Sequence, residues 1–245
     1  MIWPCLLSNV VLREGEKESE KIFANKLNNI VFHSDVSYEL QPPAVTLLAM
    51  LQTDVGGDTQ FIDLTTAYER LSPQFKQLID GLQVVHSSLE QAAASTSNGN
   101  QQRKPPVVSI HPLVRYHPVL GTKSLFFNRG FVRRIVGLKQ EESDNILTFI
   151  KNHIESCLDA HIRANWDERT VVLWDNRRLV HSATFDWDNS SLRHAFRVTP
   201  LGERPVGSKE EYDAWTPEIE KEKLKRLSEA LDATPAEYYE KFVSH

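Results

Sequence analysis

Short apolar runs separated by polar turns extend along most of this chain of 245 residues. Runs of this kind, rich in valine, isoleucine and aromatic side chains, are typical of β-strands. We expect strands at 31–39, 44–53, 84–89, 107–114, 124–128, 161–166, 170–174 and 193–201. The polar stretch 91–106 ends in two prolines and predicts a mobile loop. Many short strands favour a β-rich core of jelly-roll type.

Helical spacing interrupts this strand pattern in three places. Residues 64–70 and 72–82 predict helices, and in the second Ser72 would be the N-cap with Pro73 at the first helical position. Residues 139–158 predict a longer helix. Its apolar positions form one stripe, which comprises Ile146, Leu147, Ile150 and Ile154.

The composition becomes more charged after Pro205. We therefore expect a domain at 1–205 and a helical C-terminal extension at 206–245. Thr216-Pro217 would open a charged helix with a narrow apolar seam, and a capping box at 234–237 would start a last short helix. The extension would pack on the domain or on a partner subunit, so the sequence allows a homo-oligomer.

Overall composition narrows the class of protein. Hydrophobic content of 40% and charged content of 25% are ordinary for a globular protein. A net charge of −5 argues against a nucleic-acid partner, which would need a basic face. Two cysteines, Cys5 and Cys157, cannot form a disulfide framework and suit a reducing compartment, so we expect the cytoplasm. No run approaches the length of a membrane span, and residues 1–11 lack the basic start of a signal peptide.

The candidate chemistry lies in two separated motifs, His33-Ser34-Asp35 and His181. Residues i and i+2 of a strand point to the same face, so His33 and Asp35 would converge. His181 follows Trp174-Asp175-Asn176-Arg177, at the end of an apolar strand pattern. Two histidines and one carboxylate, with other coordination positions open, form the facial triad of non-haem Fe(II) oxygenases. An isolated His-x-Asp also arises often by chance, and a single histidine is more often structural.

Three stretches together resemble the taurine dioxygenase (TauD/TfdA) family of Fe(II)- and 2-oxoglutarate-dependent dioxygenases. They are residues 33–61 with Gly-Gly-Asp-Thr, residues 111–137, and residues 174–205. The resemblance covers roughly residues 31–205. It implies a mainly β fold, the double-stranded β-helix (jelly roll) with inserted helices. It also implies that O2 and 2-oxoglutarate are consumed to give succinate and CO2 while a small substrate is hydroxylated.

The resemblance also assigns individual residues. His33, Asp35 and His181 would bind Fe(II), while Arg193 and Thr59 would hold the distal carboxylate of 2-oxoglutarate. Arg197 is the alternative cofactor arginine if the register is shifted. Otherwise it would bind the anionic group of a sulfonate such as taurine, a sulfate ester or an aryloxyalkanoate. A third possibility is that Arg197 only pairs with a protein carboxylate. Arg193 and Arg197 would share one strand face, and Phe127 would line the substrate pocket or belong to the aromatic core.

One departure from the family leaves alternatives open. Only 32 residues precede His33, fewer than in family members, and residues 1–29 do not resemble the family's longer stretch before this motif. The chain would then be an N-terminally shortened form. One alternative is an impaired relative that binds metal and 2-oxoglutarate without turnover. Another is a structural or assembly protein that acts through its C-terminal helices.

Overall fold

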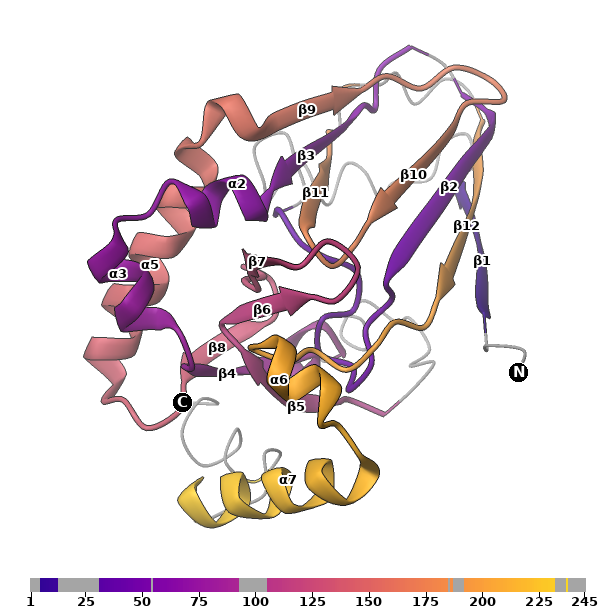
Figure 1. Ribbon diagram of the computed structural model, residues 1–245. Coiled ribbons are helices and arrows are strands. Elements are labelled where there is room, and N and C mark those ends of the chain that lie inside the picture. The colour runs from indigo at the N-terminus through magenta and orange to yellow at the C-terminus, as the bar shows by residue number, and fades with distance from the viewer. Residues whose placement is uncertain are drawn as a thin grey trace.

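The computed structural model describes residues 5–12, 31–53, 55–92, 105–184, 186, 192–231 and 237. These residues form a mixed α/β fold with several small antiparallel sheets. In Figure 1 the strands of the largest sheet form one side of the molecule, and helices α2, α3 and α5 lie together on the opposite side. Within the described ranges, no helix is both long enough and apolar enough to cross a membrane.

Four groups of strands make up the sheets, and all their pairings are antiparallel. The four-stranded sheet has the order β1 (Cys5–Leu12), β12 (Arg193–Pro200), β2 (Val45–Gln52) and β10 (Val171–Asp175). One three-stranded sheet has the order β11 (Leu179–Ala183), β3 (Thr59–Asp63) and β9 (His161–Ala164). The other has the order β5 (Val108–Pro112), β4 (Gln83–Ser87) and β8 (Val132–Ile135). A hairpin joins β6 (Val114–His117) and β7 (Thr122–Leu125).

The helices are α2 (Leu64–Glu69), α3 (Pro73–Ile79), α5 (Gln140–Ser156), the 3-10 turn η1 (Leu158–Ala160), α6 (Lys209–Asp213) and α7 (Pro217–Leu231). The predicted cap of α3 is confirmed, because the Ser72 side chain accepts a hydrogen bond from the Phe75 amide and Pro73 is the first helical residue. The predicted helices at 64–70 and 139–158 correspond to α2 and α5.

The main core lies between these helices and the smaller sheets. It contains Ile62, Ile79, Val84, Ile135 and Ile150, none of which exposes any surface. Leu147 and Ile154 of the α5 stripe also belong to it, and Ile146 packs against it. Burying each aliphatic side chain contributes about 1.5–3 kcal/mol. This core therefore anchors β3 and the residues around β11, the strands that support the candidate site.

The expected strand at 31–39 is not present. His33 forms a single antiparallel bridge with His181, and residues 35–38 form a turn. Val36 in that turn has φ of 41°, a left-handed conformation that β-branched residues rarely adopt. The prediction was wrong because side chains, rather than a neighbouring strand, bind most of this segment's backbone. Asn128 donates to the Ser34 carbonyl, and Ser109 donates to the Tyr38 carbonyl.

Other strand predictions differ in their bounds. The run 107–114 is divided between β5 and β6, and 124–128 overlaps only the end of β7. Four strands were not predicted, namely β1, β3, β8 and β11. Two expected features lie mostly outside the described residues. They are the capping box at 234–237, of which only residue 237 is described, and the loop at 91–106, of which residues 93–104 are not described.

Candidate metal centre

Two candidate ligands, His33 and His181, are fixed to each other through the backbone. The His33 amide donates to the His181 carbonyl at 3.0 Å, and the His181 amide donates to the His33 carbonyl at 2.7 Å. Their ring centroids are 4.3 Å apart. His181 is the central residue of β11, and β11 pairs with β3. The backbone bridge therefore joins two segments that are distant in sequence and places both imidazoles side by side.

Asp35 is brought to the same place by the turn at 35–38. Its side chain is buried, and its Oδ1 lies 3.9 Å from Nε2 of His181. Oδ2 accepts a hydrogen bond of 2.8 Å from the Thr46 hydroxyl on β2. One potential ligand atom from each of His33, Asp35 and His181 lies within 4.8 Å of the other two. The structure thus brings together the three side chains that the sequence predicted.

The protonation states of these groups suit a divalent transition metal. Burial lowers the pKa of His181 to about 3, so its imidazole is neutral at pH 7. Burial acts to raise the pKa of Asp35. The attraction of His181, Arg197 and His33, together with the Thr46 hydrogen bond, outweighs burial and keeps this pKa below its usual value. Because His181 is neutral, we attribute much of this effect to Arg197. Metal ligands must be neutral imidazoles and ionised carboxylates, and the triad supplies both.

The geometry also fits a metal ion. Nδ1 of His33 lies 2.9 Å from the Val31 carbonyl, and a carbonyl can only accept, so Nδ1 carries a proton. In the neutral imidazole this leaves the Nε2 lone pair for a metal. Ligands bound at about 2.1 Å lie no more than about 4.2 Å apart. A site whose ligand atoms already lie within 4.8 Å of one another needs only small side-chain adjustments. Two imidazoles and one carboxylate are the donor set expected for non-haem Fe(II).

Aromatic rings form one wall of the centre. The ring centroid of Trp174 lies 4.9 Å from that of His181, and the ring centroid of Phe61 lies 6.0 Å from that of His181. Trp174 and Phe61 contact each other edge to face at 5.3 Å. Trp174 is buried and packs in the interior beside His181. These rings restrict the His181 imidazole and reduce its contact with water, which explains its low pKa.

Thr59 follows a glycine turn at 56–57, and Arg193 contacts that turn from β12. Thr59 begins β3 and accepts a hydrogen bond of 3.0 Å from the Trp166 indole. Arg193 begins β12 and donates to the carbonyls of Gly56 at 3.2 Å and Gly57 at 2.7 Å. Gly57 has φ of 68°, and a Cβ at this position would lie 1.8 Å from Nη1 of Arg193. Glycine at position 57 is therefore what allows the arginine to approach this turn.

Arg197 lies at the metal centre itself. Its Nη1 donates to Oδ1 of Asp35 at 2.7 Å, and its side chain is one third exposed. Arg193, Ala195 and Arg197 alternate along β12, so they share the face on which Ala195 is buried. Nε of Arg197 is buried without a hydrogen-bond partner. The guanidinium thus pairs with a protein carboxylate, while one of its donors remains unsatisfied.

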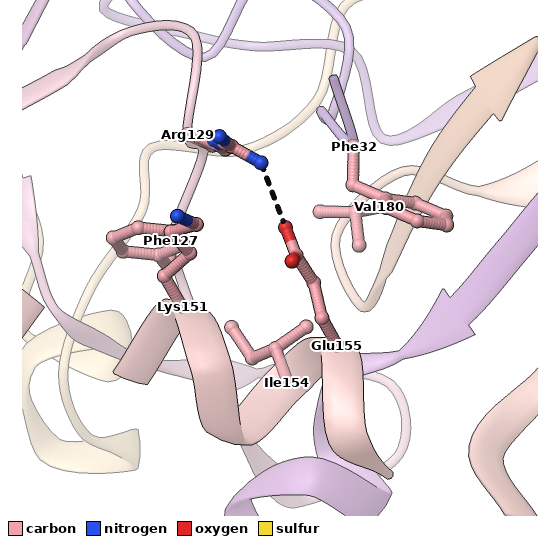
Figure 2. A pocket seen from close by; sticks show the side chains of 7 residues that line it. All are labelled: Phe32, Phe127, Arg129, Lys151, Ile154, Glu155 and Val180. Atoms are coloured by element: carbon pink, nitrogen blue, oxygen red, sulfur yellow. Dashed lines mark hydrogen bonds and ion pairs between the residues drawn. The ribbon is translucent and has the colours of Figure 1, made fainter. Parts of the chain in front are cut away.

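Phe127 lies away from the ligand atoms, in the main core. Figure 2 shows it in a small pocket with Phe32, Ile154 and Val180, where Arg129 and Glu155 form an ion pair across the opening. Phe32 and Val180 directly precede His33 and His181 in sequence. Phe127 therefore lines a pocket with the residues that precede both histidines, and its role in substrate binding stays a prediction.

Sequence reasoning missed a residue that supports the centre. This residue is Asn176, whose side-chain oxygen accepts a 2.7 Å hydrogen bond from the Asp35 amide. The available signal was the position of Asn176 in the Trp-Asp-Asn-Arg run, which does not show a partner 141 residues away. Its neighbour Arg177 has a structural role, since it forms ion pairs with Asp175 and Glu203.

Comparisons with known proteins agree with this site. The family model described as "Taurine catabolism dioxygenase TauD, TfdA family" matches residues 8–199. An "alpha-ketoglutarate-dependent sulfonate dioxygenase" from Saccharomyces cerevisiae is 47% identical over 195 residues, which is 79% of this chain and 47% of that protein. An "alpha-ketoglutarate-dependent sulfate ester dioxygenase" from Pseudomonas putida is 31% identical, over 72% of this chain and 61% of that protein.

A solved structure shows the same likeness. The crystal structure of a taurine dioxygenase from Burkholderia xenovorans superposes with a TM-score of 0.64 and 30% sequence identity. The match covers 82% of this chain and 66% of that one. The chain spans about half the length of the Saccharomyces relative.

Proposed function

Because the chain belongs to the TauD, TfdA family of taurine catabolism dioxygenases, we propose that it is an Fe(II)- and 2-oxoglutarate-dependent dioxygenase. It would hydroxylate a small anionic organic compound and release succinate and CO2. The observation that carries this proposal is the convergence of His33, Asp35 and His181, whose potential ligand atoms lie within 4.8 Å of one another. The finer fold that goes with it is the double-stranded β-helix over residues 1–205.

The three ligands would hold the iron on one side and leave its other side for small molecules. Bound iron would supply the activation of O2 and its coupling to the decarboxylation of 2-oxoglutarate. The chain's own contribution is orientation and restricted access to water. Trp174 and Phe61 form the wall beside His181, and Thr46 and Arg197 fix the Asp35 carboxylate.

The proposed site for the distal carboxylate of 2-oxoglutarate is Arg193 with Thr59. Burial lowers the pKa of Arg193, which still remains charged at pH 7. The carbonyls it contacts, of Gly56 and Gly57, immediately precede Asp58-Thr59 in sequence. A half-buried guanidinium close in space to the turn before Thr59 is suited to a carboxylate, because charge-assisted hydrogen bonds are strongest where water is scarce.

The proposed substrate carries an anionic group that meets Arg197. Two of the similar proteins act, by name, on a sulfonate and on a sulfate ester. The unsatisfied Nε of Arg197 gives the anion a donor that the ion pair with Asp35 does not use. Aryloxyalkanoates offer the same charge and belong to the proposed class. Phe127 would line the substrate pocket, although its place in the main core favours a packing role.

The other expectations stay proposals with limited support. The boundary near residue 205 is supported by the appearance of α6 and α7 beyond it. A homo-oligomer would use the extension, in which Trp215 and Ile219 are exposed. The cytoplasm is proposed because Cys157 is a free buried thiol, which suits a reducing compartment.

The experiment that tests the proposed function is succinate formation from 2-oxoglutarate with Fe(II) and ascorbate. The panel contains taurine, other sulfonates, sulfate esters, aryloxyalkanoates and neutral analogues of matched size. We expect one anionic class to stimulate succinate formation and to be consumed in a 1:1 ratio with it. Metal binding without any turnover across the panel would support the impaired relative instead.

A further inference from the structure

Asn176 joins the two sequence motifs of the metal centre. It follows β10 directly and precedes β11, the strand that carries His181. Its side chain is 2% exposed. The side-chain oxygen accepts from the Asp35 amide at 2.7 Å. The side-chain nitrogen donates to the carbonyls of Asp35 at 3.2 Å and Pro43 at 3.1 Å.

In these three hydrogen bonds the Asn176 side-chain amide acts both as an acceptor and as a donor. Only a side chain with an acceptor and two donors can bind one peptide N–H and two carbonyls at once, and among amino acids of this size only asparagine has this set. Aspartate has the same shape but cannot donate when ionised. The Asn176 backbone amide adds a fourth bond, to the Ala44 carbonyl at 2.9 Å. Asn176 is thus bound to both ends of the segment between Asp35 and Ala44.

The turn that Asn176 holds is strained. Val36, the residue directly after Asp35, has φ of 41°. A β-branched residue in this region is a genuine outlier, and such conformations persist only where surrounding contacts enforce them. Asn128 supplies further contacts, because it donates to the Ser34 carbonyl and the Ser37 hydroxyl. Without these contacts, relaxation of Val36 would rotate the peptide that carries the Asp35 side chain.

The same short segment fixes the other two ligands. His181 lies five residues after Asn176 and exchanges both backbone hydrogen bonds with His33. The segment 176–181 therefore binds the Asp35 backbone at one end and the His33 backbone at the other. The separation between the carboxylate and the two imidazoles depends on how Asn176 holds Asp35.

We propose that Asn176 is a positioning residue that sets metal affinity by holding Asp35 in its strained turn. It touches neither metal nor substrate, and it acts through the backbone of a ligand. This inference rests on the proposed function, since it requires that the triad bind a metal ion. Removing such supporting groups in metalloproteins weakens metal affinity by about 10–100-fold.

The test is titration of the metal-free protein with Co(II) or Mn(II), followed by calorimetry, for wild type, Asn176→Asp and Asn176→Ala. We expect both variants to bind about 10–100-fold more weakly than wild type. The measurement is made well below the unfolding midpoint of every variant. Ile150→Val, a substitution in the core of α5, is the matched control for lost stability and should bind as wild type does.

A second substitution separates positioning from folding. Val36→Gly removes the strain, because glycine adopts positive φ without cost. In the Asn176→Ala background it should recover part of the metal affinity, whereas it should change wild-type affinity little. Folded Asn176 variants that bind within twofold of wild type would overturn the inference. So would a loss of affinity in Ile150→Val as large as that in the Asn176 variants. Failure of wild type to bind metal would instead overturn the proposed function.

Discussion

At the scale of single residues, the sequence identified the candidate metal ligands but not the residues that contact and support them. The sequence identified His33, Asp35 and His181, and the structure brings them together. It did not reveal that Arg197 pairs with Asp35 or that Asn176 binds the Asp35 backbone, because both partners are more than 140 residues away. Long-range contacts depend on the complete fold, and local patterns do not encode them.

Gly57 and Arg193 offer a test of the 2-oxoglutarate site. Gly57→Ala should displace the guanidinium, because its Cβ would lie 1.8 Å from Nη1 of Arg193. We expect this variant and Arg193→Ala to raise the 2-oxoglutarate concentration for half-maximal succinate formation by about 100-fold or more, the effect of removing one partner of a buried charged pair. Gly81→Ala is the control, since its φ is also positive but nothing lies near its Cβ. If Arg197→Ala gives this effect and Arg193→Ala does not, Arg197 is the cofactor arginine.

Arg197 offers a test of the anionic substrate. Arg197→Gln should raise the KM for the best anionic substrate by roughly tenfold or more, since a charge-assisted hydrogen bond is lost. The affinity for 2-oxoglutarate, measured by calorimetry with Mn(II), should change much less. Neutral substrates that outperform every sulfonate, sulfate ester and carboxylate on the wild-type protein would remove the basis for this assignment.

At the scale of elements, the regular segments were easier to predict than the irregular ones. The α5 stripe and the Ser72 cap were found because periodicity and capping are local properties. The segment 31–39 was wrongly predicted as a strand, since its alternating pattern is satisfied by a turn held by side chains. The strand β11 was missed although it carries His181, because its five residues contain only three apolar positions.

The paired strands β4 and β5 carry two buried histidines, and these predict how stability depends on pH. Burial lowers the pKa of His111 to about 3 and that of His86 well below its usual value. Both groups are neutral in the folded protein but titrate near pH 6.5 when unfolded. The unfolded state therefore binds more protons below pH 6.5, and stability is present above that pH and lost as pH falls.

Between pH 7 and pH 5 each histidine should reduce the free energy of unfolding by about 2 kcal/mol. Urea unfolding at pH 7, 6 and 5 measures this dependence. His111→Gln can still donate to the Glu39 carbonyl that His111 contacts, and it should be less sensitive to pH than wild type. An unfolding free energy equal at pH 7 and pH 5 would show that these histidines are not buried as neutral groups.

At the scale of the whole molecule, the family resemblance supplied more than the strand pattern did. The pattern favoured a β-rich core, and the structure is a mixed α/β fold with several small antiparallel sheets. Strand order could not be predicted, because β2 lies between β12 and β10, and both of these strands are far from β2 in sequence. Figure 1 shows α7 apart from the sheets, beyond α6.

The boundary of the C-terminal extension can be tested by truncation. Val206 is buried, and its carbonyl accepts a 2.7 Å hydrogen bond from the Tyr116 amide. Deletion of 208–245 should therefore leave metal binding intact, whereas deletion of 206–245 should lower the unfolding midpoint by several degrees. Particle size by light scattering, measured on the same variants, shows whether the extension supports an oligomer. Loss of metal binding on deletion of 208–245 would mean that the extension belongs to the domain.

The central claim is that His33, Asp35 and His181 form one metal site on which 2-oxoglutarate binding depends. The most direct test is calorimetric titration of metal-free wild type and His181→Ala with Mn(II), each followed by 2-oxoglutarate. We predict one tightly bound ion per wild-type chain, 2-oxoglutarate binding only after the metal, and neither event in His181→Ala. Equal metal binding by the folded variant, or 2-oxoglutarate binding to wild type that does not depend on metal, would contradict the claim.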